Sequence, residues 1–216
     1  TGVAALAVVN FAVANSAADA AAQLGNGMML TQFGVTLYTS PLKWVVMLAP
    51  LAFIFLFTFK IQSMSAGMAQ IMFWTFAGLM GISLSSIFLV YTSESIVRVF
   101  FITAAAFAGL SLFGYTTKKD LSGWGSFLVM GLIGIIIAML VNIFLQSSAL
   151  QFAISVIGVL VFAGLTAYDT QRIKESYSVN DDGSVTSRKA IMGALSLYLN
   201  FINMFMMLLS LFGNRE

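Results

Sequence analysis

The sequence contains no cysteine and no histidine, and only 8% of its 216 residues are charged. Without Cys, a disulfide framework, a thiolate nucleophile and a Cys-based metal site are all excluded. Without His, the chain lacks the commonest metal ligand and general base, and the only side chain that ordinarily titrates near neutral pH. Any proton-sensing group in this chain is therefore expected to be a carboxylate.

The scarcity of charge is matched by an excess of apolar residues. A soluble domain carries about 25% charged residues, whereas 60% of this chain is hydrophobic and its mean hydropathy is +0.97. This composition predicts an integral membrane protein whose main partner is lipid. The net charge of +2 is too small to indicate binding to nucleic acid.

The apolar runs predict an all-α, polytopic membrane protein with seven transmembrane helices, a central C-terminal helix, and a single transmembrane domain over residues 1–216. A transmembrane helix needs about 20 apolar residues, and the first run is shorter than that. We interpret it as the second part of a longer helix, and residues 15–42 as a polar, Gly-rich loop. The predicted runs are 1–14, 43–60, 68–91, 97–116, 123–146, 151–169 and 190–213.

The positions of Lys and Arg predict the orientation in the membrane, because cytoplasmic loops are enriched in these residues. In the seven-helix layout one side carries seven basic residues and the other carries three. The N-terminus is therefore predicted to be cytoplasmic and the C-terminus to lie outside. The seven are Lys60, Lys118, Lys119, Arg172, Lys174, Arg188 and Lys189, and the three are Lys43, Arg98 and Arg215.

Polar residues inside apolar runs are candidates for function, because burying them in lipid is costly. Asp169 ends the sixth run, and it either lines an internal path or reaches water at the interface. On the seventh run Gly193, Ser196, Asn200 and Asn203 are spaced three, four and three, which places them on one helical face. The side-chain amides of Asn200 and Asn203 either line a path or join helices by hydrogen bonds. Asn200 lies near the predicted midplane of the bilayer.

Motifs for catalysis are missing from the sequence. HExxH, GxSxG, a Walker loop and GxGxxG do not occur. An aspartyl membrane protease needs two facing carboxylates that share a proton, and Asp169 has no second acid within an apolar run. We therefore expect no enzymatic activity and no cofactor.

The pair Tyr168-Asp169, the charged segment after it and the string ALSLYLNFINMF over 194–205 resemble the bacterial branch of the Bax inhibitor-1 family, also called TMBIM. The string KKDLS over 118–122 and the seven-helix layout fit as well. The resemblance implies a pH-sensitive calcium leak channel in a bacterial inner (plasma) membrane. The alternative that it implies is a non-conducting modulator of protein quality control or stress response, which binds a membrane protease complex or other membrane partners.

The resemblance also implies a gate made of two acids, with a basic residue on the second helix that latches one of them. Asp169 matches the first acid, but Asn200 stands at the second position, so an amide replaces a carboxylate. Lys60 is the nearest basic residue for the latch, or else an end-of-helix lysine that reaches water. Asp169 and Asn200 together would bind Ca²⁺ only weakly, because Ca²⁺ prefers several hard oxygen ligands. The predicted pore and gating residues are thus Asp169, Asn200, Lys60, Asn203 and Ser196.

Overall fold

The computed structural model describes residues 1–16, 19–24, 27–178 and 181–215. Within these residues six helices are long and apolar enough to cross a membrane, and one shorter apolar helix precedes them. The predicted all-α class is confirmed, with one small hairpin added. The chain divides into two compact units, Thr1–Thr92 with Arg215–Glu216 (unit 1) and Ser93–Asn214 (unit 2). The prediction of a single transmembrane domain stays a prediction.

Unit 1 is built around α1, α3 and α4, and α4 packs against both of the others. Thr1 Oγ1 donates to the Ala77 carbonyl at 3.0 Å, and the lack of a side chain at Gly81 lets α1 approach α4 closely. Its elements are α1 (Gly2–Ala12), β1 (Ala22–Gln23), β2 (Met29–Leu30), α2 (Gln32–Tyr38), α3 (Leu42–Lys60), the 3₁₀ turn η1 (Ile61–Ser63), α4 (Ala66–Leu84) and the 3₁₀ turn η2 (Ser85–Leu89).

The segment predicted as a loop over 15–42 is instead partly ordered into β1, β2 and α2, so that prediction is wrong. β1 and β2 pair antiparallel, with Ala22 opposite Leu30. Thr31 then begins α2, because its Oγ1 accepts a hydrogen bond from Gly34 N at 3.1 Å and satisfies a free amide of the first turn. The same hydroxyl donates to the Phe11 carbonyl at 2.7 Å, which ties α2 to the end of α1.

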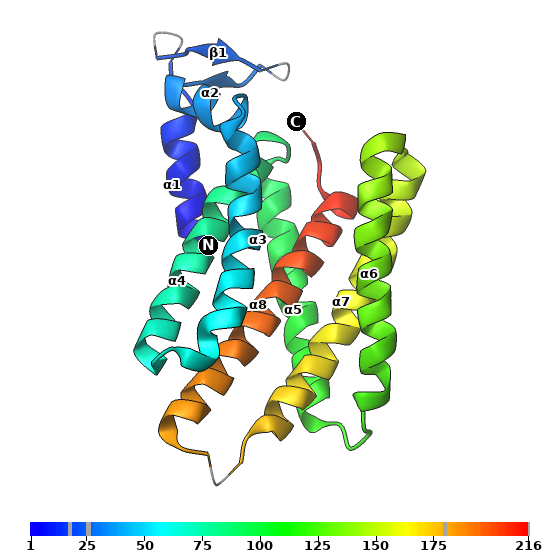
Figure 1. Ribbon diagram of the computed structural model, residues 1–216. Coiled ribbons are helices and arrows are strands. Elements are labelled where there is room, and N and C mark those ends of the chain that lie inside the picture. The colour runs from blue at the N-terminus through cyan, green and yellow to red at the C-terminus, as the bar shows by residue number, and fades with distance from the viewer. Residues whose placement is uncertain (17–18, 25–26, 179–180, 216) are drawn as a thin grey trace. The chain divides into compact units, whose positions relative to one another are not determined.

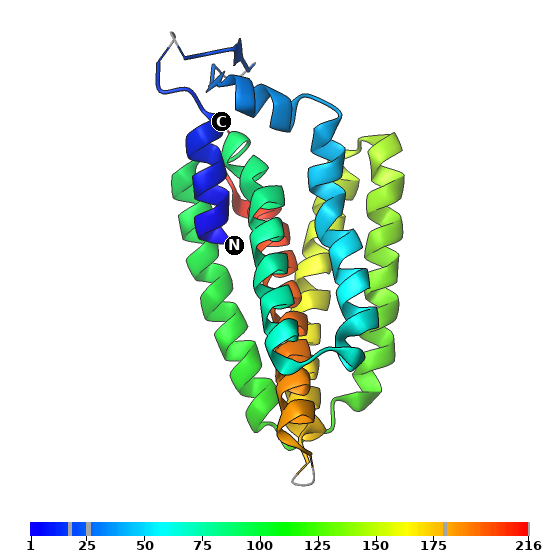
Figure 2. The same ribbon diagram turned by 60° about the vertical axis from the view of Figure 1, so that its left-hand side comes forward.

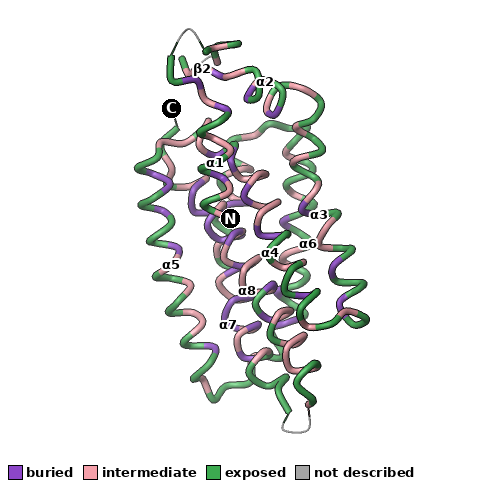
Figure 3. The backbone as a smooth tube through the Cα atoms, turned by 90° about the vertical axis from the view of Figure 1, so that its left-hand side faces the viewer, coloured by how far each residue is buried: buried purple, intermediate pink, exposed green. Residues whose placement is uncertain are grey.

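Unit 2 consists of four long helices: α5 (Ser93–Thr116), α6 (Ser122–Leu145), α7 (Ser148–Ser176) and α8 (Gly183–Phe212). α7 packs against the other three, and α8 packs against α7 and α5. In the most apolar stretch of α8, 44% of the residues are buried, against 11% in that of α6. This confirms the C-terminal helix as the most enclosed span. Figure 3 shows the same contrast, with buried backbone concentrated along α7 and α8.

Both α7 and α8 extend well beyond the apolar runs that predicted them. The sixth run was predicted to end at Asp169, yet α7 continues to Ser176, and α8 begins at Gly183 rather than near 190. Hydropathy locates the apolar part of a helix, whereas capping decides where the helix begins. Asp182 caps α8, since its Oδ1 accepts from Ser184 N and Val185 N at 2.8 Å each.

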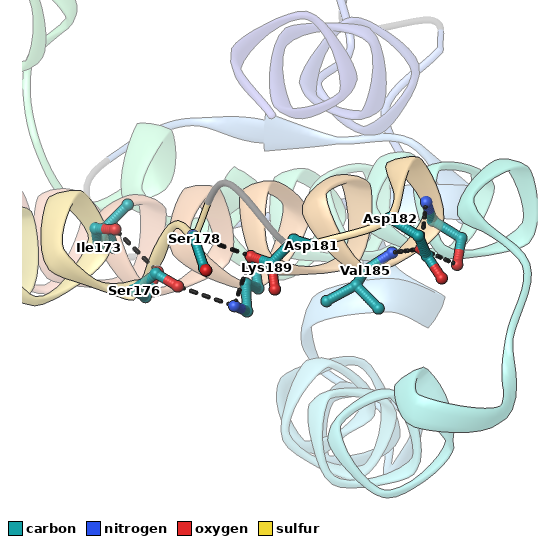
Figure 4. A network of polar contacts seen from close by, with 8 residues as sticks. Ile173, Ser176, Ser178, Asp181, Asp182, Val185 and Lys189 are labelled. Carbon is teal, nitrogen blue, oxygen red and sulfur yellow. Dashed lines mark hydrogen bonds and ion pairs between the residues drawn. The ribbon is translucent and has the colours of Figure 1, made fainter.

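The connection between α7 and α8 is held by a polar network (Figure 4). Lys189 Nζ lies 2.6 Å from Asp181 Oδ2 and donates to the Ser176 carbonyl at 2.8 Å. Ser178 N donates to the same carboxylate at 3.1 Å. These hydrogen bonds, the one from Lys189 first, hold the pKa of Asp181 below its usual value.

The α5–α6 and α7–α8 connections lie at the same end of unit 2, as Figures 1 and 2 both show. Arg98, near the start of α5, lies toward the other end. The basic residues of unit 2 are therefore grouped as the positive-inside pattern predicts. Which compartment this basic end faces stays a prediction. The grouped residues are Lys118, Lys119, Arg172, Lys174, Arg188 and Lys189.

Candidate functional site

Two glycines set the position of α7 around Asp169. On α5, a Cβ at Gly114 would collide with the backbone carbonyl of Ala167. On α6, a Cβ at Gly125 would lie 2.7 Å from the Tyr168 ring. Close approach of helices through such small residues is the usual way in which spanning helices pack. The residues just before Asp169 are thereby held by α5 and α6, so its carboxylate has a defined place.

Asp169 lies at the interface of α7 with α8, and 8% of its surface is exposed. Asn200 Nδ2 on α8 donates to Asp169 Oδ2 at 2.8 Å. On α7 itself, one turn after Asp169, Arg172 Nη2 lies 3.5 Å from Asp169 Oδ1. Each carboxylate oxygen thus has its own partner. The Arg172 side chain is itself 58% exposed, and its Cζ lies 5.8 Å from the centre of the Tyr168 ring, so the ion pair reaches from a buried acid toward solvent.

The polar stripe predicted on α8 contributes unequally to this site. Asn200 is buried and contacts Asp169, whereas Asn203 is half-buried and its Nδ2 donates to the Leu199 carbonyl of its own helix at 2.8 Å. Ser196 is half-buried, one turn before Asn200. Gly193 packs closely on the Ile173 side chain of α7. Only Asn200 of the stripe is brought to the carboxylate.

The hydrogen bond between Asp169 and Asn200 shows that the two residues share one level of the bundle. The sequence puts Asp169 at the end of its apolar run, where it either lines a path or reaches the interface, and puts Asn200 near the midplane, and these two depths do not match. The error comes from counting along each apolar run separately. Asp169 lies seven residues before the end of α7 and Asn200 lies 17 after the start of α8. Because of this difference of ten residues, α8 runs about 15 Å further along its axis from the turn to the contact than α7 does.

Arg172 is the site residue that sequence reasoning missed. It was assigned to a charged loop because the apolar run ends at Asp169. The signal that could have found it is the spacing of an acid and a base three residues apart, which pairs their side chains once the helix is extended. Lys60, the predicted latch, ends α3 in unit 1 with an exposed side chain, and its role stays a prediction.

Two further residues of the α7 end anchor the α5–α6 connection. Gln171 is buried, with its Nε2 donating to the Lys119 carbonyl at 2.9 Å and its Oε1 accepting from Leu121 N at 2.8 Å. Lys174 Nζ donates to the Tyr115 carbonyl at 2.7 Å, which satisfies a free carbonyl at the end of α5. The turns of α7 that follow Asp169 are therefore fixed on two sides.

The side chains around Asp169 provide too few free oxygen ligands to bind a cation tightly. Asn200 turns its amide nitrogen toward Asp169, and the other carboxylate oxygen faces Arg172. Ca²⁺ takes six to eight oxygen ligands, and nowhere in the described part of the chain do three acids lie close enough to hold a metal. The arrangement is instead that of a closed polar contact between two helices, with one charge that protons or cations can compete for.

Buried polar contacts between long apolar helices of this kind define a polytopic helical membrane protein. Comparison with known proteins agrees. Over residues 1–216 the chain matches the family described as inhibitor of apoptosis-promoting Bax1. It belongs to this family, the Bax inhibitor family, which confirms the resemblance seen in the sequence.

Several bacterial relatives are similar over most of their length. An uncharacterized protein of Caulobacter vibrioides is 51% identical over 191 residues, covering 88% of this chain and 76% of the relative. The inner membrane protein YbhL of Escherichia coli is 50% identical over 173 residues, covering 79% of this chain and 74% of YbhL. An uncharacterized protein of Rickettsia prowazekii is 49% identical over 172 residues, covering 80% and 73%.

Proposed function

We propose that this protein is a cation leak channel of a bacterial inner membrane, with calcium as a permeant ion, and that the contact of Asp169 with Asn200 and Arg172 closes it. The observation that carries the proposal is the burial of Asp169. It is the only charged residue buried among the described residues, and it lies within a spanning helix. A charged group inside such a helix is costly, and such groups mark ion paths and proton relays in membrane proteins.

The closure depends on the charge of Asp169. An ionised carboxylate attracts the Arg172 guanidinium and accepts from the Asn200 amide, which together join α7 to α8. A protonated carboxyl keeps a hydrogen-bonding partner in Asn200 but loses the attraction to Arg172. Flux is therefore expected to rise as the pH falls.

Permeation of calcium through this level needs no tight site. A cation that reaches Asp169 must displace Arg172 from one carboxylate oxygen, and the Asn200 carbonyl becomes a ligand only when the amide turns over. A single carboxylate and one amide oxygen bind Ca²⁺ weakly. Weak binding suits conduction, because an ion that binds tightly does not leave.

The test is calcium flux into liposomes that contain the purified protein, over a pH series, for wild type and Asp169→Asn. A single titrating carboxylate changes the flux by at most about tenfold per pH unit. Asp169→Asn keeps the shape of the side chain and removes its charge, so we expect a raised flux at neutral pH and a flat pH profile. Glu175→Gln is the matched control, since Glu175 is an exposed acid on the same helix, and it should keep the wild-type profile.

A variant that conducts like wild type at every pH would show that Asp169 does not gate. If the folded wild-type protein passes no cation at any pH, the leak itself is refuted. The non-conducting modulator of a membrane protease complex would then be the better hypothesis.

A further inference from the structure

A second group of polar side chains lies at the other end of the α7–α8 interface. We call Asn142, Gln151, Ser155 and Ser210 the second polar cluster. Ser155 Oγ lies 3.1 Å from Ser210 Oγ, and Gln151 Nε2 donates to Ser210 Oγ at 3.4 Å. Asn142 Nδ2 of α6 donates to Gln151 Oε1 at 3.2 Å, so three helices meet there. Ser155 is completely buried.

The hydrogen bonds of this cluster are interchangeable. The Ser155 hydroxyl has one proton and two acceptors within reach. These are Ser210 Oγ at 3.1 Å and the backbone carbonyl oxygen of Gln151 at 2.9 Å. Ser210 has a second donor in Gln151 Nε2, so it keeps a partner when Ser155 turns away. Hydroxyl groups rotate freely to suit their neighbours. Rotation of the Ser155 hydroxyl away from Ser210 therefore leaves both hydroxyls hydrogen-bonded, and Ser155 keeps its bond to the Gln151 backbone carbonyl even when α7 and α8 separate.

An apolar stretch, residues 156–165 of α7 and 204–209 of α8, lies between this cluster and the turns that carry Asp169 and Asn200. Asp169 lies fourteen residues after Ser155 on α7, a rise of about 21 Å, and Ser210 lies ten residues after Asn200 on α8, a rise of about 15 Å. Met207 fills the space over Gly158, where a Cβ would lie 2.9 Å from the methionine Cγ. Met side chains have three rotatable bonds and repack easily. The interface thus reads polar, apolar, polar along its length.

We propose that the second polar cluster is a second closure of the same path, in series with Asp169, and that it takes a partly dehydrated cation on neutral hydroxyl and amide oxygens. This inference rests on the proposed leak function. Hydroxyl and amide oxygens replace part of a cation's hydration shell without holding it as a charge does, and an apolar constriction beside them stops ions when it is dry. Met207 over Gly158 supplies that constriction.

The lack of native cysteine makes a direct test possible. Ser155→Cys places a nearly isosteric thiol in the cluster, and Ser210→Cys is a second variant on the less buried side of the same contact. The control is Ile157→Cys, two residues along α7 on its exposed, lipid-facing side. Each protein is placed in liposomes and treated with a positively charged, membrane-impermeant methanethiosulfonate. Reaction after denaturation shows that each thiol is present and competent.

Thiols react as thiolates in water, so a thiol on a hydrated path should react at least about tenfold faster than one facing lipid. We expect this at 155 and 210, with a further increase in the Asp169→Asn background, and we expect modification at either position to block calcium flux. Modification at 157 should leave flux unchanged.

Slow reaction at both 155 and 210, in wild-type and Asp169→Asn backgrounds, would show that the cluster only joins helices. With pH-dependent flux intact, that result overturns the second closure alone. Absence of calcium flux from the wild-type protein overturns the leak function, and the second closure with it.

Discussion

At one level of the α7–α8 interface a carboxylate meets an amide and a guanidinium, whereas at the other level only hydroxyls and amides meet. Both levels join the same two helices, and both hold buried polar atoms with hydrogen-bond partners. They differ in charge. The Asp169 level can therefore answer to protons and to cations, while the second polar cluster keeps the same charge at every physiological pH and answers only to movement of the helices.

Asn200→Asp should have the largest effect on flux, because it adds a second carboxyl group at the Asp169 level, which we call the charged level. Asn200 already contacts Asp169 at 2.8 Å, so two carboxyl groups there must share a proton at neutral pH. We expect the midpoint of the pH response of flux to move upward by about one pH unit or more. Inhibition of flux by Ca²⁺ should tighten by about tenfold, since two carboxylates can bind one ion.

Asn203→Asp is the control for that variant. Asn203 lies one turn along α8 and bonds its own backbone rather than Asp169. An acid there should leave the pH midpoint and the Ca²⁺ inhibition near the wild-type values. If both variants behave alike, the effect comes from added charge in general and the contact of 169 with 200 is irrelevant to gating.

Gly114→Ala should disturb the charged level through packing alone. The new Cβ would collide with the Ala167 carbonyl, two residues before Asp169, so α5 and α7 must separate. Such overpacking costs about 1–3 kcal/mol of stability. We expect a lower melting temperature in detergent and a higher flux at neutral pH.

Gly109→Ala is the matched substitution on the same helix, and nothing lies within 4 Å of a Cβ there. It should keep the melting temperature or raise it slightly, because Ala favours helix over Gly. Equal melting temperatures for the two variants would mean that the close contact of α5 with α7 at Ala167 does not exist in the membrane.

Asp181→Asn should have the smallest effect, and it sharpens the comparison by removing a rival pH sensor. The pKa of Asp181 is lowered in the folded protein, so its contact with Lys189 is fully formed above the usual carboxyl pKa of about 3.9 and is lost only as the pH falls through the lower folded value. Asp181 therefore stays ionised between pH 5 and 8. We expect flux within about twofold of wild type across that range, because this ion pair lies in the α7–α8 turn and does not contact Asp169. A shifted pH profile would instead assign the sensing to the α7–α8 turn.

Sequence reasoning located two of the three residues of the charged level. Asp169 and Asn200 stand out because each is polar within an apolar run, and that contrast needs no tertiary structure to be seen. Arg172 was missed because a charge beyond an apolar run looks like a loop residue. The second polar cluster was missed for a related reason. Gln151 and Ser210 lie near the ends of their runs, where polar residues are common and attract no notice.

The sequence by itself determined that this chain is a helical membrane protein of the Bax inhibitor family, because apolar length and a short specific string depend only on the order of residues. It also determined that any pH sensing uses a carboxylate, since no histidine is present. Only the tertiary structure decided which polar residues meet. The pairing of Asp169 with Asn200 depends on the register between α7 and α8, to which the start of α8 at its Asp182 cap and the close packing of Gly193 on Ile173 contribute. Such contacts join residues far apart in the chain, and no local pattern encodes their register.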